Sequence, residues 1–220
     1  MSCCLFLMVK APINGEVKTR LIEKIGEYHS TELYKRFLLD IVEKIEETDT
    51  PTIMYYTPES ELENLTGLLG NYNKYVHQKG KDLGERLLNG FRYTKKLGYK
   101  SAVALATDVP DLPTEIINES INSMEGYGAV IGPSPDGGYY LIGLKNEYLD
   151  EDLFSEIEWG TDSVFERTIK KLQDKKIRTK ILEPWMDIDT YEDLRMLSKN
   201  NAFEGSKTFK YLEKNPEILF

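Results

Sequence analysis

The chain of 220 residues is poor in the residue types that build zinc sites and nucleophilic centres. It contains only two cysteines, which are adjacent at Cys3 and Cys4, and only two histidines, His29 and His77. None of them has a partner at the spacing of a zinc site. Neighbouring side chains of a strand point to opposite faces, which argues against a disulfide between the cysteines. We expect both cysteines to pack in a buried strand and both histidines to be solvated or structural.

Long apolar runs are also absent. The longest, from Cys3 to Val9, has the length of a strand and is far short of the ~20 residues that span a bilayer. It follows the first methionine without the basic leader and small-residue cleavage site of a signal peptide. We therefore expect a soluble, cytoplasmic protein that has no membrane partner.

Positively charged side chains are fewer than negatively charged ones. The chain has 28 Lys and Arg residues against 37 Asp and Glu, which leaves a formal net charge of −9. Binding to nucleic acid needs a basic face that neutralises phosphates, so the composition argues against a nucleic-acid partner. Any smaller phosphate ligand must be held by a local cluster of Lys and Arg.

The order of apolar and polar segments predicts alternating strands and helices. Strands are expected at 3–9, 52–57, 72–77, 101–107, 129–132, 139–144 and 177–182. Helices are expected from Ser30, as a cap, to about residue 45, and at 59–69, 83–96, 113–124, 162–175 and 191–198. Such alternation is typical of an α/β fold with a mostly parallel sheet covered by helices on both faces.

This pattern indicates one domain over residues 1–200. The segment PSPDGG leaves no room for a helical crossover between its flanking strands, so that pair is expected to be antiparallel and the sheet mixed. Residues 201–220 are polar and form a C-terminal extension that either packs on the domain as a helix or is flexible. This extension is also where a homodimer contact is possible.

The segment KAPINGEVKTRL follows the first expected strand, at the strand end where α/β folds bind ligands. It combines Lys10, Lys18 and Arg20 with the loop residues Pro12 and Gly15. Backbone N–H groups and Lys or Arg side chains together cradle phosphate, so this loop is a candidate nucleotide site. The spacings of the Walker A and dinucleotide-binding loops are both absent. A solvated charged loop is the alternative.

Carboxylates follow two other expected strands. Asp108 comes directly after SAVALAT, where a single carboxylate can hold Mg²⁺ (or Mn²⁺) whose other ligands are phosphate oxygens and water. Asp187 and Asp189 share one side if the backbone is extended, and either can complete a metal site with Asp108. The alternatives are turn and capping roles. Asp111 and Thr190 are expected to cap the helices that follow them.

The turn Asp136–Gly138 lies between the two strands of the expected antiparallel pair. Its glycines permit close approach of backbone to a ligand, although a plain hairpin turn explains them as well. Tyr139 and Tyr140 alternate across the strand, so one of them is expected to face the site and the other the core.

The segment KGKDLGERLLNGF has the form of a helix N-terminus, which attracts anions. Asp82, Gly84 and Arg86 open this helix, and we include them as candidate nucleotide-binding residues.

Together these segments resemble a known family. LFLMVKAPINGEVKTRL, QKGKDLGERL, ATDVPDL, GPSPDGGYYLIGL, WGTDSVFERT and DIDTYEDL occur in this order over nearly the whole chain. They resemble the glycosyltransferase-A-fold family often called radical-SAM/selenodomain-associated transferases, within the nucleotide-diphospho-sugar transferase superfamily. More distantly, the chain is similar to 2-phospholactate guanylyltransferases and molybdenum-cofactor nucleotidyltransferases.

The resemblance implies a Rossmann-like, mixed seven-stranded sheet that binds a nucleotide or sugar nucleotide together with Mg²⁺. It assigns Lys10, Lys18 and Arg20 to the phosphates, and Asp108 and Asp189 to the metal. It places Asp82 and Arg86 near the base or ribose. The implied acceptor side consists of Asp136, Gly137, Tyr139, Trp159, Gly160 and Thr161.

One departure from the family pattern guides the choice of reaction. Glycosyltransferases of this fold usually carry Asp-x-Asp, whereas this chain has Asp108-Val109-Pro110, closer to the Asp-x-Pro form of nucleotidyltransferases. Our leading hypothesis is nucleotidyl transfer from a nucleoside triphosphate to a small acceptor, with Lys18, Arg20 and Asp108 as catalytic residues. Glycosyl transfer from a nucleotide-sugar and nucleotide binding without catalysis are the alternatives.

Overall fold

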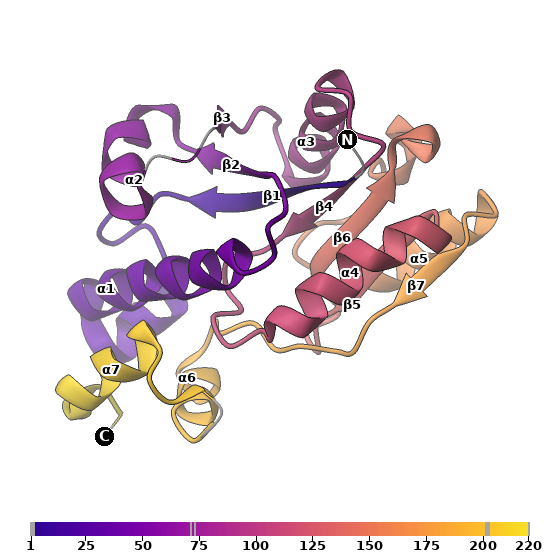
Figure 1. Cartoon of the computed structure of the whole chain (residues 1–220). Coiled ribbons are helices and arrows are strands. Elements are labelled where there is room, and N and C mark those ends of the chain that lie inside the picture. Colours follow the sequence, from indigo (N-terminus) through magenta and orange to yellow (C-terminus); the bar gives the residue numbers. More distant parts are fainter. Residues whose placement is uncertain (1–2, 71, 73, 201–202, 220) are drawn as a thin grey trace.

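The computed structural model describes residues 3–70, 72, 74–200 and 203–219. These residues form one seven-stranded sheet in the order β3-β2-β1-β4-β6-β5-β7 (Figure 1). The strands are β1 (Cys3–Lys10), β2 (Thr52–Thr57), β3 (Tyr75–His77), β4 (Ser101–Leu105), β5 (Ala129–Pro133), β6 (Tyr139–Lys145) and β7 (Thr179–Ile181). Of the strand expected over 72–77, residues 75–77 form β3 and residues 72 and 74 are not in a strand, while residue 73 lies outside the described residues.

The sheet is mixed because of one strand. β6 runs antiparallel to both of its neighbours, β4 and β5, while the other neighbouring pairs are parallel. The short connection between β5 and β6 cannot hold a crossover helix, so the chain returns as a hairpin. The expectations of an antiparallel pair around PSPDGG and of a mostly parallel, seven-stranded sheet are therefore confirmed.

Helices cover both faces of the sheet (Figure 1). They are α1 (Thr19–Glu46), α2 (Leu62–Leu69), α3 (Leu83–Lys96), α4 (Thr114–Gly126), α5 (Val164–Asp174), α6 (Tyr191–Leu197) and α7 (Lys207–Lys214). Among the residues that the structure describes, no helix combines the length and the apolar character needed to cross a membrane.

Strand β1 is apolar from Cys3 to Val9 because it packs against helices on both faces. Leu5 and Leu7 pack in the cluster that includes α1 and α4, whereas Phe6 packs in the opposite cluster, which includes α3 and α5. The two free, buried cysteines divide in the same way, Cys3 to the first cluster and Cys4 to the second. The expectation of a strand buried on both faces, without a disulfide, is confirmed.

The first helix begins earlier than its sequence predicts. Helix α1 starts at Thr19 and bends at Gly26, whose φ of 77° and ψ of 164° are not helical. Ser30 lies inside the helix beyond this bend, and its hydroxyl donates a hydrogen bond to the Gly26 carbonyl. The capping role expected of Ser30 is therefore wrong. The first segment was missed because Leu21 is its one fully buried apolar residue, too little for a visible helical period.

The C-terminal helix α7 packs against α1, as Figure 1 shows at the lower left. Asp40 of α1 is 2% exposed, and its carboxylate accepts hydrogen bonds from the backbone N–H groups of Lys207 (2.7 Å) and Thr208 (2.9 Å). These are among the first N–H groups of α7, which have no partner inside the helix. A carboxylate from α1 therefore caps α7.

Replacing Asp40 by alanine is expected to lower the free energy of unfolding by about 2–4 kcal/mol, because it removes two charge-assisted hydrogen bonds and leaves two N–H groups without an acceptor. Glu43→Ala is the matched control. It removes the ion pair of an exposed carboxylate with the same Lys207, which is worth about 0–1 kcal/mol. Urea unfolding measures both. Equal losses for the two variants would contradict the capping role.

Candidate active site

A pocket of about 320 Å³ lies where three loops meet. Strands β1 and β4 are parallel neighbours, so the loop after β1 and the residues after β4 leave the sheet at the same edge. The segment between β7 and α6 closes the pocket from the side. The lining residues are Lys10, Glu16, Val17, Lys18, Thr19, Arg20, Tyr34, Asp108 and Asp189.

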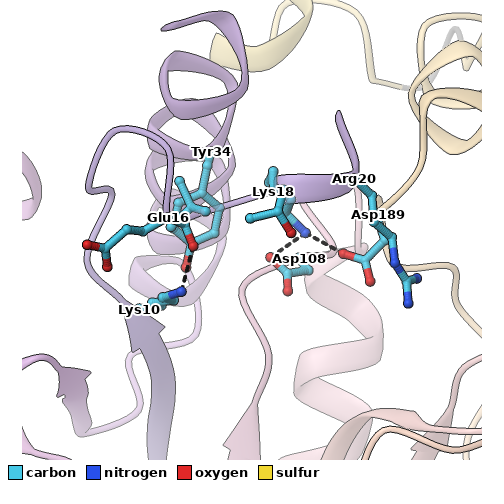
Figure 2. A pocket seen from close by; sticks show the side chains of 9 residues that line it. Lys10, Glu16, Lys18, Arg20, Tyr34, Asp108 and Asp189 are labelled. Atoms are coloured by element: carbon cyan, nitrogen blue, oxygen red, sulfur yellow. Dashed lines mark hydrogen bonds and ion pairs between the residues drawn. The ribbon is translucent and has the colours of Figure 1, made fainter. Parts of the chain in front are cut away.

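The centre of this pocket is the ammonium group of Lys18 (Figure 2). Its Nζ lies 2.7 Å from Oδ1 of Asp108 and 2.8 Å from Oδ1 of Asp189. The Lys18 side chain is 4% exposed, whereas those of Asp108 and Asp189 are 37% and 43% exposed. The structure thus brings Lys18 together with two carboxylates that lie far from it in the sequence, one after β4 and one before α6.

Aromatic rings form the inner wall behind Lys18. Its Nζ lies 5.9 Å from the ring centroid of Tyr34 and 5.8 Å from that of Phe37, both on α1. These distances are within the range of cation–π attraction. The ammonium group is therefore held between two carboxylates on the open side and two rings on the buried side.

Local hydrogen bonds position Asp189. The backbone N–H of Ile188 donates to the carbonyl of Asp108 (2.9 Å), which ties the β7–α6 loop to the end of β4. On its other side, Thr190 caps α6 in a reciprocal capping box with Asp193. The capping role expected of Thr190 is confirmed, and it leaves Asp189 facing Lys18.

The opposite charges stabilise one another electrostatically. Burial by itself would lower the pKa of Lys18, but Asp108 and Asp189 more than offset this, and the pKa of Lys18 is raised. Burial likewise opposes ionisation of Asp189, yet the positive charges of Lys18 and Arg20 lower its pKa overall. Lys18 is therefore a cation and Asp189 an anion over the neutral pH range.

Asp187 has a different environment from Asp189. Its side chain accepts a hydrogen bond from the Ser134 hydroxyl and is not among the described residues that line the pocket. Burial is the main cause that raises the pKa of Asp187 to about 7, and the nearby Asp136, Asp108 and Asp189 add to it. Of the two carboxylates in this loop, only Asp189 contacts Lys18.

Asp111 does not cap the next helix. The N-cap of α4 is Pro113, which makes no side-chain capping bond. The Asp111 carboxylate instead accepts hydrogen bonds from Trp185 Nε1 (2.9 Å) and Asn200 Nδ2 (3.1 Å). The expectation of a cap was wrong because the Asp111 carboxylate is already occupied by the indole of Trp185 and the amide of Asn200. Both donors are distant in sequence, so no local pattern indicated them.

The loop after β1 carries the remaining positive charge. Lys10 Nζ donates to the backbone carbonyl of Glu16 (2.6 Å), which closes the loop, and the exposed Arg20 lines the pocket in the first turn of α1. Thr19 and Arg20, the first two residues of α1, line the same pocket, and an α-helix leaves N–H groups at these positions without an internal partner. Pro12 and Gly15 belong to the loop but are not among its described pocket-lining residues.

Sequence reasoning missed four lining residues, Glu16, Val17, Thr19 and Tyr34. The first three adjoin Lys18 in the sequence, so the motif around Lys18 could have predicted them. Tyr34 had no such signal, because it occupies an ordinary core position of α1. Its buried hydroxyl lies 3.1 Å from Thr107 Oγ1, beside Asp108.

The segment that opens α3 has structural contacts of its own. Asp82 is the N-cap of α3 and accepts a hydrogen bond from the N–H of Glu85 (2.9 Å), and Arg86 Nε donates to the carbonyl of Gly80 (3.2 Å). Asp82 and Gly84 line a second cavity of about 250 Å³, which has no lining residue in common with the Lys18 pocket. Their assignment to the nucleotide stays a prediction.

Trp159 packs directly on the start of α3. A side-chain carbon at Gly84 would lie 2.6 Å from the carbonyl oxygen of Phe154 and 2.7 Å from Trp159 Nε1. Trp159 also contacts Tyr139, with ring centroids 6.4 Å apart in an edge-to-face arrangement. The structure thus joins one residue expected on the nucleotide side, Gly84, to two expected on the acceptor side.

We expect Gly84→Ala to lower the free energy of unfolding by about 1–3 kcal/mol, because the new methyl group overlaps backbone as well as Trp159. Gly67→Ala is the matched control. Gly67 is also helical, but a side-chain carbon there would have nothing within 4 Å, so alanine is expected to add roughly 0.5–1 kcal/mol. Thermal unfolding compares the two. A Gly84→Ala protein as stable as the parent would show that this contact is loose.

The rest of the expected acceptor side forms one surface. Asp136 accepts a hydrogen bond from the N–H of Gly138 (2.9 Å), which shapes the turn between β5 and β6. Gly137 has a φ of 88°, and a side-chain carbon there would lie 2.0 Å from the carbonyl oxygen of Asp162. The turn therefore packs on the segment that follows Gly160 and Thr161.

The two carboxylates of the pocket suit a hard divalent cation. Mg²⁺ is commonly bound by one or two carboxylates, with phosphate oxygens and water as its other ligands. Oδ1 of Asp108 and Oδ1 of Asp189 already share one cation, the ammonium of Lys18. Among the described residues no group of three or more His, Cys, Asp or Glu side chains forms a metal cage. Asp108 and Asp189 alone would leave most ligand positions of a bound Mg²⁺ to phosphate oxygens and water.

Comparison with known proteins identifies the family. The family model described as "Uncharacterized protein conserved in bacteria (DUF2064)" matches residues 41–161, more than half of the chain. The chain belongs to this family. Its motif-based assignment to the nucleotide-diphospho-sugar transferase superfamily is confirmed as well.

Three relatives of this DUF2064 protein are informative. A crystal structure from Desulfovibrio desulfuricans G20, named as a candidate nucleotide-diphospho-sugar transferase, is 34% identical with a TM-score of 0.95, over 100% of this chain and 97% of that one. The 2-phospho-L-lactate guanylyltransferase of Methanocaldococcus vulcanius is 25% identical over 84% of this chain and 79% of its own length. A cytidylyltransferase from Leptospira borgpetersenii, 17% identical, shares the fold with a TM-score of 0.60, over 100% and 97% of the two chains.

These similarities agree with the fold and with the predicted enzyme class. The DUF2064 protein is a nucleotidyltransferase-like member of a superfamily of transferases.

Proposed function

We propose that this protein transfers a nucleotidyl group from a nucleoside triphosphate to a small acceptor. In this reaction an acceptor oxygen attacks the α-phosphorus, a new phosphorus–oxygen bond forms, and the bond to the β-phosphate breaks, so that pyrophosphate leaves. The observation that carries the proposal is the buried Lys18 between Asp108 and Asp189, in a pocket with Lys10 and Arg20. The similarity to a guanylyltransferase supports it.

The cations of the pocket are proposed to bind the phosphates. A volume of about 320 Å³ is at the lower end of the ~300–1,000 Å³ of small-molecule pockets, so the pocket suits the phosphate groups while the nucleoside extends beyond it. Lys18 and Arg20 would neutralise the charge that builds on the leaving pyrophosphate. Lys10 and the first N–H groups of α1 would hold the same phosphates in the ground state.

Asp108 and Asp189 are proposed to hold Mg²⁺ (or Mn²⁺), which when bound supplies charge neutralisation and orientation at the phosphates. The protein itself needs little covalent chemistry in such a transfer. The scarcity of cysteine and histidine therefore does not argue against catalysis. Positioning of the phosphates and of the acceptor is what the side chains must provide.

The acceptor is proposed to bind beside the Asp136–Gly138 turn and the segment from Trp159 to Thr161, where the ring of Tyr139, whose hydroxyl is buried, packs against Trp159. A small molecule with a phosphate or hydroxyl oxygen as nucleophile suits the reaction. The M. vulcanius relative is named for guanylyl transfer to 2-phospho-L-lactate, which makes GTP with this acid the first substrate pair to assay.

Glycosyl transfer from a nucleotide-sugar is the second candidate. The similarity to the D. desulfuricans protein, named after nucleotide-diphospho-sugars, favours it. The same pocket would then hold a diphosphate, and no pyrophosphate would be released from a nucleoside triphosphate.

A thermal-shift screen distinguishes the candidates. We expect one nucleoside triphosphate with Mg²⁺, at about 100 times its dissociation constant, to stabilise the fold by ~2.7 kcal/mol and to raise the apparent Tm by roughly 5–10 °C. Release of pyrophosphate with an acceptor present then tests turnover. A shift with a nucleotide-sugar alone would favour glycosyl transfer, and binding without any turnover would indicate a nucleotide-binding module. No shift with any nucleotide would contradict the proposal.

A further inference from the structure

The position between Asp108 and Asp189 is already filled by a cation. Lys18 Nζ is within 2.8 Å of both carboxylate oxygens and is nearly removed from solvent. Figure 2 shows the ammonium group between the two carboxylates, with no other labelled side chain reaching that point. A divalent ion held by the same two oxygens, Oδ1 of Asp108 and Oδ1 of Asp189, would have to displace this ammonium group. Two cations cannot share this position.

The backbone aims Lys18 at this position. Lys18 has a φ of 49° and a ψ of 44°, the left-handed conformation that non-glycine residues adopt sparingly. Of the four non-glycine residues of the described chain with positive φ, Lys18 alone lines the pocket. Such conformations persist where the surrounding structure holds them, and they cluster at ligand sites. Here the ion pairs and the rings of Tyr34 and Phe37 hold the side chain inward.

A polyphosphate bound in the pocket would offer Lys18 an alternative partner. The pocket also contains Lys10 and Arg20, whose positive charges attract phosphate. A phosphate bound there offers anionic oxygens to the Lys18 ammonium group. If the lysine turned to such a phosphate, Asp108 and Asp189 would be free to hold a metal.

We propose that Lys18 acts as a placeholder for the metal: in the ligand-free protein it excludes divalent cations from Asp108 and Asp189, and only a bound phosphate chain draws it away. This proposal rests on the proposed function, since it supposes that the pocket binds a polyphosphate with a metal. It explains why two acidic residues with no further carboxylate ligand meet at one point in the free protein. It also makes metal and nucleotide binding mutually dependent, by the same factor in each direction.

The test measures Mn²⁺ binding to the nucleotide-free protein by electron paramagnetic resonance, which needs no turnover. Removing the Lys18 ammonium changes the charge of the three side chains from −1 to −2 and opens the shared position. We expect Lys18→Met to bind Mn²⁺ at least about tenfold more tightly than the parent protein, a size typical of coupled sites. Lys18→Gln, which keeps a polar side chain of similar length, is expected to do the same.

Lys10→Met is the matched control. It removes an ammonium group from the same pocket, but Lys10 contacts the Glu16 carbonyl and neither carboxylate. Its Mn²⁺ affinity is expected to stay within about threefold of the parent, since an exposed charge at longer range is screened by salt. Asp189→Asn combined with Lys18→Met is expected to lose the gain.

The outcomes separate this proposal from the proposed function. Tight Mn²⁺ binding to the free parent protein that Asp189→Asn removes would overturn the placeholder role, even if the Lys18 variants do not fold. Equal affinities of the folded Lys18→Met and parent proteins would overturn it too. In either case a nucleotide hit in the thermal-shift screen would leave nucleotidyl transfer standing. A gain in Lys18→Met without any nucleotide hit would support the exclusion of metal by Lys18 and remove the proposed function.

Discussion

Replacing Lys18 by methionine is expected to lower kcat for nucleotidyl transfer by a factor on the order of 10³, which corresponds to about 4 kcal/mol of transition-state stabilisation. Methionine carries no positive charge, so the pocket loses one of the two cations proposed to neutralise the leaving pyrophosphate. Methionine keeps an unbranched side chain of similar length beside Tyr34 and Phe37 and removes the ammonium charge. Pyrophosphate release under saturating substrate measures the effect.

Two further variants define what Lys18 contributes. Lys18→Arg is expected to recover little activity, because a planar guanidinium group is larger than the ammonium group that this 4%-exposed position holds. Lys35→Met is the control for a lysine of α1 that lies outside the pocket and pairs with Glu32. Its kcat should stay within about twofold of the parent. A Lys18→Met protein that turned over at the parent rate would refute the catalytic role.

Asp108→Asn is expected to reduce kcat on the order of 10²–10³-fold and to remove the additional thermal shift that Mg²⁺ gives with the nucleotide. An amide oxygen is a neutral and weaker ligand for Mg²⁺, so the phosphates lose part of their charge neutralisation. The nucleotide alone is still expected to shift the Tm, because Lys10, Lys18 and Arg20 remain in place. Retained Mg²⁺ dependence and retained turnover would show that Asp108 does not hold the metal.

Asp111→Asn provides the matched control, from the same loop and with the same loss of charge. Asp111 accepts hydrogen bonds from Trp185 and Asn200 and is not among the described pocket-lining residues. This variant is expected to lose about 1–3 kcal/mol of stability, because an amide group cannot accept both bonds equally well. Its kcat should remain near that of the parent. The pair of variants thus separates a carboxylate that acts on the substrate from one that holds the fold.

Much of the fold was predictable because the signals for its strands and helices are local. The continuous apolar runs of β1 and β4 predict strands buried on both faces, and both are buried at every position but two in β1. The short PSPDGG connection predicts an antiparallel pair for the steric reason given above. By contrast, the first turns of α1 have one fully buried side chain, Leu21, and no helical period, so only their packing revealed them.

The candidate site was predictable in part, for a topological reason. Lys18 and Asp108 follow neighbouring parallel strands, and residues that follow such strands emerge at one edge of the sheet. Sequence spacing could not choose between Asp187 and Asp189, because both follow the same strand. Hydrogen bonds distinguish the two carboxylates. The Ser134 hydroxyl donates to the side chain of Asp187. The Ile188 N–H donates to the carbonyl of Asp108, and Asp189 lies beside Lys18.

The sequence by itself determined the fold class, the strand-end positions of the charged loops and the family motifs, because these depend on local composition and order. Only the tertiary structure decided that Lys18 is buried between Asp108 and Asp189, that Asp111 binds Trp185, and that Asp40 caps α7. Each of these contacts joins residues that are distant in the sequence. In each case the carboxylate accepts hydrogen bonds from the donors that the fold places within reach. A charged side chain has several such candidate partners along the chain, and only the packed structure selects among them.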